Sequence, residues 1–324
     1  MVGAVITHKG RIVGEGFTSP FGGPHAEVRA IEAVGDPSLL REATLYVTLE
    51  PCCHHGKTPP CTDLILRMGI PKVVIGIQDP HDKVKGQGIK KLLDGGCQVE
   101  TGVMEAACRD HHRRFLTFHE KKRPYLILKW AQSADGFLAP ADARRTGPPK
   151  PFWISGPASR QLVHRWRSEE QAILVGTRTA LKDNPRLNTR LWAGRSPLRI
   201  LIDRKLQVPV HYHILDGEVP TLVYHQEGTP PQSPKQVRYK ALGPGGNVLQ
   251  QILKDLWEEG IQSVLVEGGA RTLNTFKESG YWDEARIIHG PALLGEGLPA
   301  PGLKGRLVDS WDLDGDRIRI LQND

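Results

Sequence analysis

The sequence predicts an α/β protein made of two domains. The chain has 324 residues, about twice the length of a typical domain. Short apolar runs alternate with stretches of helical spacing along its length, which is typical of layered α/β domains. A basic helical stretch is broken at Arg123-Pro124, because proline disfavours helix at the residue before it. We therefore expect one domain over residues 1–122 and a second over 123–324.

The first domain is expected to combine five strands with four helices. Lys9-Gly10 reads as the turn between the first two strands, and Ala26, Ile31 and Val34 have the spacing of one helix face. The expected strands cover residues 2–6, 11–15, 44–49, 72–77 and 98–103. The expected helices cover residues 25–34, 62–68, 88–93 and 105–122.

The second domain shows the same alternation of strands and helices. The expected strands cover residues 125–131, 172–175, 198–202, 221–224 and 263–267. The expected helices cover residues 157–167, 248–259 and 272–277. Residues 226–246 are rich in Pro, Gly and Gln, so we expect a surface loop there.

Composition excludes several classes of protein. With 39% hydrophobic and 24% charged residues the chain is neither disordered nor fibrous. No apolar run approaches the roughly 20 residues that span a bilayer, and the N-terminus lacks the plan of a signal peptide. We expect a cytoplasmic protein with no membrane partner. The net charge of +7 is scattered along the sequence, which favours an anionic small substrate over nucleic acid.

Three short segments predict a metal centre. They are Pro24-His25-Ala26-Glu27, Leu49-Glu50-Pro51-Cys52 and Thr58-Pro59-Pro60-Cys61. Zinc prefers thiolate and imidazole ligands in a tetrahedron, and a catalytic site leaves one corner for water. We expect His25, Cys52 and Cys61 to bind Zn²⁺, and Glu27 to carry the proton of a hydrolytic reaction.

The spacing of these residues favours a zinc deaminase. Zinc nucleobase deaminases carry His-x-Glu and a later Pro-Cys pair, commonly as Pro-Cys-x2-Cys. Here eight residues separate Cys52 from Cys61, so a Pro-rich turn must bring the second thiolate back. The alternative is a structural zinc site, in which Cys53, His54 or His55 would be the fourth ligand.

Further motifs follow the metal segments along the chain. They are Gln78-Asp79-Pro80, Val84-x-Gly86-x-Gly88, Leu128-Lys129, Ser133-x-Asp135-Gly136, Trp153-Ile154-Ser155, Ala172-Ile173-Leu174-Val175-Gly176, Asp183-Asn184-Pro185-Arg186-Leu187 and Val266-Glu267-Gly268-Gly269. With Gly56-Lys57-Thr58-Pro59-Pro60-Cys61, they make nearly the whole chain resemble the bifunctional riboflavin-biosynthesis deaminase/reductase family.

This resemblance implies a fold and two reactions. It implies a cytidine-deaminase-like three-layer domain followed by a dihydrofolate-reductase-like domain. The first would hydrolytically deaminate a diaminopyrimidinone that carries a ribosylamino phosphate. The second would use NADPH to reduce the ribosyl group to a ribityl chain. We also expect a homo-oligomer.

The resemblance also implies the residues of the reductase site. Substrate contacts would come from Arg167, Leu187, Arg190 and Glu267. NADPH contacts would come from Ala131, Trp153, Thr179, Asp183, Gly269, Ala270, Arg271, Thr272, Leu273, Asn274 and Thr275. The proton donor of the reduction stays open between Lys129 and Asp183.

Two alternatives remain at this point. Members of the family usually carry a helix and an Asn-Pro pair before the first strand, and Met1 is here the first residue of that strand. A chain without them would be a reductase whose deaminase domain is structural. The second alternative, a nucleic-acid-editing deaminase, is disfavoured because the second domain lacks interleaved aromatic residues for base stacking.

Overall fold

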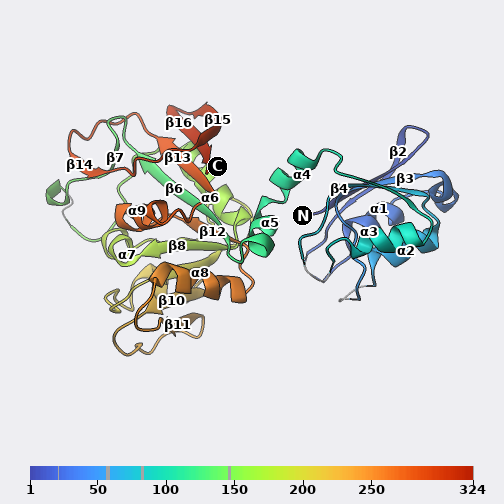
Figure 1. Cartoon of the computed structure of the whole chain (residues 1–324). Coiled ribbons are helices and arrows are strands. Elements are labelled where there is room, and N and C mark those ends of the chain that lie inside the picture. The colour runs from blue at the N-terminus through green and yellow to red at the C-terminus, as the bar shows by residue number, and fades with distance from the viewer. Residues whose placement is uncertain (21, 56–58, 82–83, 145–146, 324) are drawn as a thin grey trace. The chain divides into compact units, whose positions relative to one another are not determined.

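The chain forms two compact units, Met1–Lys121 and Lys122–Asp324 (Figure 1). The computed structural model describes residues 1–324 except 21, 56–58, 82–83, 145–146 and 324. Among the helices of this described part, none has the length and apolar character needed to cross a bilayer.

A five-stranded mixed sheet forms the centre of the first unit. Its order is β2-β1-β3-β4-β5, with β1 antiparallel to both neighbours and β3, β4 and β5 parallel to one another. The turn at Lys9 and Gly10 has positive φ at both residues. The strands are β1 (Gly3–His8), β2 (Arg11–Phe17), β3 (Thr44–Leu49), β4 (Lys72–Ile77) and β5 (Gln98–Thr101).

Helices cover both faces of this sheet and make three layers. One face packs against α1 (Ala26–Glu32), α2 (Cys61–Met68) and α3 (Gln87–Asp94), which lie together in Figure 1. The other packs against α4 (Glu105–His111) and α5 (Arg113–Glu120). A short 3-10 helix, η1 (Pro37–Glu42), precedes β3.

The single helix expected over residues 105–122 is wrong. The helix is interrupted at His112, which caps both α4 and α5 with φ −92° and ψ 9°. The ring of His112 is buried, and its Nε2 lies 2.9 Å from Oγ1 of Thr48. The interruption therefore coincides with the point where the segment contacts the sheet.

The second unit is built on a nine-stranded sheet. Its order is β11-β10-β9-β8-β12-β6-β13-β16-β15, in which the first seven strands are parallel and the last two pairs antiparallel. A separate pair joins β7 and β14. The strands are β6 (Tyr125–Gln132), β7 (Phe137–Pro140), β8 (Ala172–Gly176), β9 (Leu198–Ile202), β10 (Thr221–His225), β11 (Val237–Ala241), β12 (Ser263–Val266), β13 (Glu284–His289), β14 (Gly297–Pro299), β15 (Arg306–Leu313) and β16 (Asp316–Gln322).

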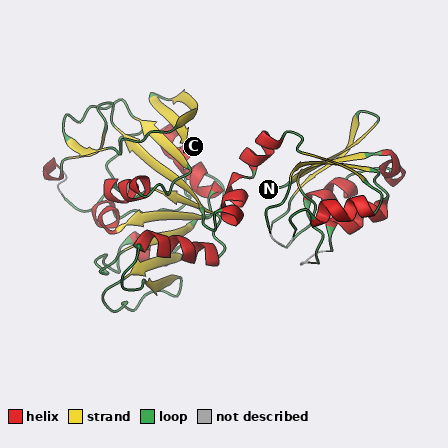
Figure 2. Cartoon of the chain, viewed as in Figure 1, coloured by secondary structure: helices red, strands yellow, loops and turns green. Residues whose placement is uncertain are grey.

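Helices cover this sheet on both faces as well (Figure 2). One core forms against α8 (Val248–Glu258) and α9 (Ala270–Glu278), and the other against α6 (Pro157–Glu169) and α7 (Thr177–Asp183). Short 3-10 helices are η2 (Asp142–Arg144) and η3 (His213–Leu215). Every residue of β8, β10 and β12 is buried, and burial on both faces explains the nearly continuous apolar runs of β8 and β12. The α/β class expected for both units is thus confirmed.

The surface loop expected over residues 226–246 is only partly correct. It contains β11, which pairs in parallel with β10 at the edge of the sheet. Most side chains of β11 are exposed, so its sequence lacks the apolar run that marks the inner strands. β15, at the opposite edge, was missed for the same reason. Five of its eight residues are exposed, and four of the eight are polar or charged.

Candidate active sites

Three predicted ligands come together in the first unit. His25 lies just before α1, Cys52 follows β3, and Cys61 is the first residue of α2. The Nδ1 atom of His25 lies 3.5 Å from Sγ of Cys52 and 3.3 Å from Sγ of Cys61. The ligand atoms of all three lie within 4.8 Å of one another. Elements distant in the sequence therefore place one imidazole and two sulfurs around a common point.

This donor set fits zinc. Ordinary Zn–N and Zn–S bond lengths in a tetrahedron separate nitrogen from sulfur by about 3.6 Å, close to the distances found. Among the residues that the structure describes, no Cys53, His54 or His55 atom joins the group, and this disfavours a closed structural site. Gly56, Lys57 and Thr58 of the family motif lie outside the described residues.

Glu27 is placed to handle a proton beside these ligands. It lies in the first turn of α1 and is 3% exposed. Burial raises the pKa of Glu27 to about 7, and the nearby Cys52 thiolate acts in the same direction. Hydrogen bonding from Cys61 lowers the pKa of Cys52 to about 4, with His25 acting in the same sense. The group thus combines a ready thiolate ligand with a carboxyl that can gain or lose a proton near neutral pH.

Glu50, two residues before Cys52, supports this site, although its type and position alone predicted no role. The carboxylate is buried and accepts four backbone N–H groups from the loop that follows β4 and from the first turn of α3. The donors are Asp79 at 3.2 Å, Gly86 at 3.0 Å, Gly88 at 2.9 Å and Ile89 at 3.1 Å. Gly88 has no room for a side chain, because a Cβ there would lie 2.2 Å from the carbonyl oxygen of Pro51. The loop is therefore held directly against the segment that carries Cys52.

The second unit contains a cavity of about 1390 Å³. It lies where parallel strands β6, β8, β9 and β12 end, the edge at which α/β sheets bind ligands. The residues predicted for the reductase site line it with one exception. The lining residues are Ala131, Trp153, Arg167, Thr179, Asp183, Leu187, Arg190, Glu267, Gly269, Ala270, Arg271, Thr272, Leu273 and Thr275.

Asn274 is the exception to this agreement. It belongs to α9 and does not line the cavity. A continuous run of residues cannot all face one side of a helix, since successive side chains turn by about 100°. The prediction for Asn274 is therefore not supported by its position.

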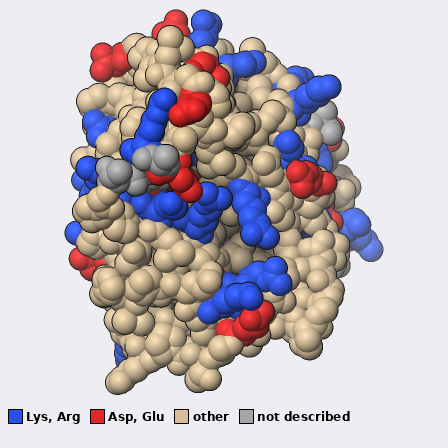
Figure 3. Space-filling view, turned by 90° about the vertical axis from the view of Figure 1, so that its left-hand side faces the viewer, with Lys and Arg blue, Asp and Glu red and all other residues tan. Residues whose placement is uncertain are grey.

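Positive charge surrounds the cavity. Figure 3 shows Lys and Arg side chains gathered round a hollow on this face of the molecule. The basic lining residues are Lys129, Arg160, Arg167, Arg178, Lys182, Arg186, Arg190, Arg204, Lys205 and Arg271. The acidic ones are Asp142, Asp183, Glu227 and Glu267. This excess suits a ligand that carries phosphate groups.

Glu267 forms the charged centre of the cavity floor. Its two oxygens accept a fork of hydrogen bonds from Nε and Nη2 of Arg167, each at 2.8 Å, and Nζ of Lys129 lies 3.5 Å away. Burial by itself would raise the pKa of Glu267, but Arg167 and Lys129 lower it to about 2. Burial also lowers the pKa of Lys129. Glu267 thus stays a carboxylate and fixes both cations.

Arg190 lies beside this cluster on the segment after α7. Its backbone N–H donates to Nδ1 of His164 at 3.1 Å, and its Nη1 donates to the side-chain oxygen of Asn188 at 3.0 Å. Burial lowers the pKa of His164 to about 4, so this ring is neutral and its Nδ1 accepts. His164 and Arg186 line the cavity as well. They were not predicted as site residues, because the family resemblance did not imply them and a single His or Arg carries no spacing signal.

Close glycine packing shapes the part of the cavity formed by α7 and α9. A Cβ on Gly268 would lie 2.8 Å from Cβ of Thr272, and one on Gly176 would lie 2.5 Å from its Oγ1. The N–H of Gly269 donates to Oγ1 of Thr179 at 2.6 Å. No side chain caps the first turn of α9, so its first amides can meet an anionic group.

Trp153 and Arg160 also line the cavity. The ring of Trp153 is 53% exposed, and the guanidinium carbon of Arg160 lies 4.9 Å from its centroid. An exposed indole held by a cation offers a flat surface on which a ring could stack.

Two family models match the chain in its two units. Residues 1–77 match the cytidine and deoxycytidylate deaminase zinc-binding region, and residues 124–317 match the RibD C-terminal domain. The first match contains all three predicted metal ligands, and the second contains the whole cavity lining from Lys129 to Leu298.

Known proteins resemble the chain over nearly its full length. It is 41% identical to riboflavin biosynthesis protein RibD of Aquifex aeolicus over 311 residues, covering 95% of this chain and 85% of that protein. It is 33% identical to the protein of the same name from Escherichia coli, covering 100% and 91%. A Thermotoga maritima crystal structure of a diaminohydroxyphosphoribosylaminopyrimidine deaminase/5-amino-6-(5-phosphoribosylamino)uracil reductase superposes with a TM-score of 0.87 at 37% identity, covering 99% and 91%. The fold class predicted for the two units is confirmed by these matches, and the chain belongs to the RibD family of riboflavin biosynthesis proteins.

Proposed function

We propose that this chain catalyses two consecutive reactions of riboflavin biosynthesis. The first unit hydrolytically deaminates 2,5-diamino-6-ribosylamino-4(3H)-pyrimidinone 5′-phosphate. The second reduces the ribosyl group of the product to a ribityl chain with NADPH. The convergence of His25, Cys52 and Cys61 beside the buried Glu27 is the observation that carries the first reaction. The basic cavity of the second unit supports the other.

In the deaminase site we assign the metal to His25, Cys52 and Cys61. When bound, zinc lowers the pKa of a coordinated water towards neutrality. Glu27 takes a proton from the attacking water onto its carboxylate and gives it to the departing ammonia. A pKa of about 7 suits both transfers, since the group can accept and return the proton at neutral pH.

In the reductase site the chain binds the substrate and the cofactor and supplies the proton of the reduction. When bound, NADPH supplies the hydride that reaches C1 of the opened ribose. Arg190 and Arg167 bind the substrate phosphate side, and the first turn of α9 binds a phosphate of the cofactor. Glu267 orients Lys129 towards the cavity. Lys129 and Asp183 both line the cavity and both remain candidates for the proton donor.

The reductase-only alternative is not favoured. The deaminase region matches its family model, and the predicted ligands and Glu27 are assembled. A cytoplasmic location, a homo-oligomeric state and the absence of a nucleic-acid partner stay predictions.

Two signals followed on one substrate test the proposal. The diaminopyrimidinone substrate is given with zinc and NADPH, and ammonia release and NADPH oxidation are recorded separately. We expect both signals, with oxidation lagging behind ammonia release. If no ammonia is released but NADPH is oxidised once the deaminated intermediate is supplied directly, the reductase-only alternative is supported. Ammonia release without oxidation would remove the second activity.

A further inference from the structure

A buried arginine behind the reductase cavity has no role in the chemistry described so far. Arg199 lies in β9 and is 0% exposed, although its side chain does not line the cavity. A fully buried guanidinium is unfavourable unless all of its donors are satisfied. All three nitrogens of Arg199 donate hydrogen bonds, so its buried charge is satisfied by specific acceptors.

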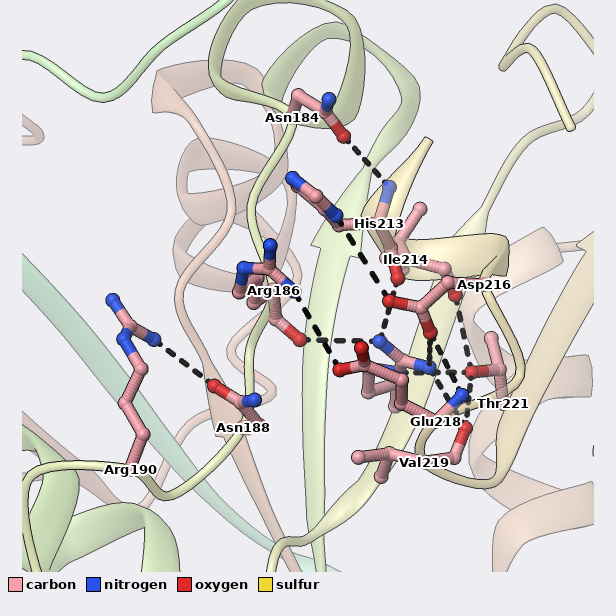
Figure 4. Close-up of polar contacts among 11 residues, drawn as sticks. Asn184, Arg186, Asn188, Arg190, His213, Ile214, Asp216, Glu218, Val219 and Thr221 are labelled. Atoms are coloured by element: carbon pink, nitrogen blue, oxygen red, sulfur yellow. Dashed lines mark hydrogen bonds and ion pairs between the residues drawn. The ribbon is translucent and has the colours of Figure 1, made fainter. Parts of the chain in front are cut away.

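The acceptors of Arg199 come from separate parts of the chain. Nε donates to Oγ1 of Thr221 at 3.0 Å, and Nη2 donates to Oδ1 of Asp216 at 2.8 Å and to the carbonyl of Val219 at 2.9 Å. Nη1 donates to the carbonyl of His213 at 2.7 Å. Figure 4 shows these acceptors from the connection between β9 and β10 gathered round one point.

The remaining bond of Arg199 reaches the segment that lines the cavity. Nη1 also donates to the carbonyl of Arg186 at 3.2 Å, and Arg186 lies opposite the other acceptors in Figure 4. The next residue, Leu187, is buried with a φ of 51°, a conformation that residues other than glycine seldom adopt. A fixed carbonyl directly before Leu187 holds this turn in place.

Beyond Leu187 the segment is tied at two further points. The carbonyl of Asn188 accepts from Nη1 of Arg167 at 3.2 Å, and the N–H of Arg190 donates to His164. Together with the bond to the carbonyl of Arg186, these ties set the path of the backbone from which Arg190 projects. Among these three side chains that bind the backbone of residues 186–190, Arg167 and His164 line the cavity and Arg199 does not.

We propose that Arg199 is a positioning residue for substrate binding in the reductase site. By holding the carbonyl of Arg186, it fixes the turn at Leu187 and aims Arg190 at the phosphate of the substrate. This role rests on the reductase function proposed above. It differs from a purely structural role because it predicts a selective loss of substrate affinity.

Arg199→Lys tests the role, because a lysine keeps the charge but cannot span the same five acceptors. With the deaminated intermediate as substrate, we expect KM to rise at least about tenfold, since small displacements of a binding group weaken it strongly. We expect kcat to change less than KM, and KM for NADPH to stay as in the wild type. Ammonia release by the first unit should be unchanged.

Arg286→Lys is the matched control. Arg286 is also buried in the same sheet, where its guanidinium bonds to Glu170 and Glu284, and it does not line the cavity. Equal increases in KM for the two variants would overturn the proposal, as would an unchanged KM in a folded Arg199→Lys protein. If Arg199→Lys does not fold, Thr221→Val removes a single acceptor, and the same selective rise in KM is expected on a smaller scale.

Hydrogen exchange keeps the test independent of turnover. The N–H groups of Thr189 and Arg190 donate to Ser196 and His164, so they should exchange slowly in the wild type. Faster exchange over residues 186–190 in Arg199→Lys, but not in Arg286→Lys, supports the positioning role even if the wild type shows no reductase activity. Unchanged exchange in this segment contradicts it.

Discussion

Two buried glutamates show how environment assigns opposite roles to the same side chain. Burial raises the pKa of Glu27 to about 7, because it outweighs the lowering effects of a backbone hydrogen bond and of His25. Glu267 is equally buried, but Arg167 and Lys129 lower its pKa to about 2. The first can therefore exchange a proton at neutral pH, and the second is a permanent anion that holds two cations.

Replacing Glu27 tests the first of these roles. In Glu27→Gln we expect ammonia release to fall by about 10²–10⁴-fold, because the amide cannot carry the proton. Zinc content, measured by metal analysis, should stay near that of the wild type, since Glu27 is not a predicted ligand. Glu32→Gln, an exposed change on the same helix, should leave ammonia release unaltered. Full activity of Glu27→Gln would remove the proton shuttle.

Glu50 allows a prediction about stability. In Glu50→Gln the side chain can no longer satisfy four backbone donors with two acceptor oxygens, so we expect unfolding to require about 1–3 kcal/mol less free energy. Denaturant unfolding measures this. Glu100→Gln, which removes an exposed ion pair with Lys72, should cost less than about 1 kcal/mol. Similar losses in both variants would show that the buried network contributes little.

At the scale of single residues, the sequence predicted the residues that belong to a motif of characteristic spacing. His25, Cys52 and Cys61 were predicted together because their types and spacing fit one metal, and the structure brings them together. Glu50 and Arg199 were not given roles. Their importance lies in backbone groups that they bind after folding, and a single charged residue does not reveal its partners.

At the scale of elements, burial explains several of the strands that the sequence predicted or missed, although the buried strand β13 was also missed. β8 and β12 are covered on both faces and appear as apolar runs in the sequence. β11 and β15 lie at opposite edges of the sheet and expose most of their side chains, so no apolar run marks them. The interruption between α4 and α5 was missed for a different reason, because the helical spacing of the sequence continues through His112.

The junction of α4 and α5 predicts how stability depends on pH. Burial lowers the pKa of His112 from 6.5 to about 4, so the folded protein keeps this ring neutral while the unfolded chain protonates near pH 6.5. The unfolded state then binds more protons, and stability should fall as pH decreases from about 6.5 to 4. In His112→Gln this part of the decline should disappear from urea unfolding curves. The exposed His111→Gln should retain most of it, because burial lowers the pKa of His112 more than the neighbouring His111 does. Identical profiles for both variants would contradict the role of His112.

For the whole molecule, the described residues of each candidate site belong to one unit. The metal ligands and Glu27 belong to Met1–Lys121, and every residue that lines the reductase cavity belongs to Lys122–Asp324. Changes in sites that share no residue usually have additive effects. The two activities should therefore be separable in the intact chain.

Metal removal gives the sharpest test of this separation. Treating the full chain with a chelator should abolish ammonia release, because the three ligands of the first unit no longer hold the ion that activates water. NADPH oxidation should persist when the deaminated intermediate is supplied directly, since no group of potential ligands was found among the described residues of the second unit. Arg190→Ala should show the converse, with ammonia release kept and oxidation of NADPH reduced through a higher KM for the intermediate. Adding zinc back should restore ammonia release in the chelated wild type but not in Cys52→Ala. Loss of both activities on chelation would instead mean that the reductase site depends on the metal-bearing unit, and the independence of the two sites would have to be abandoned.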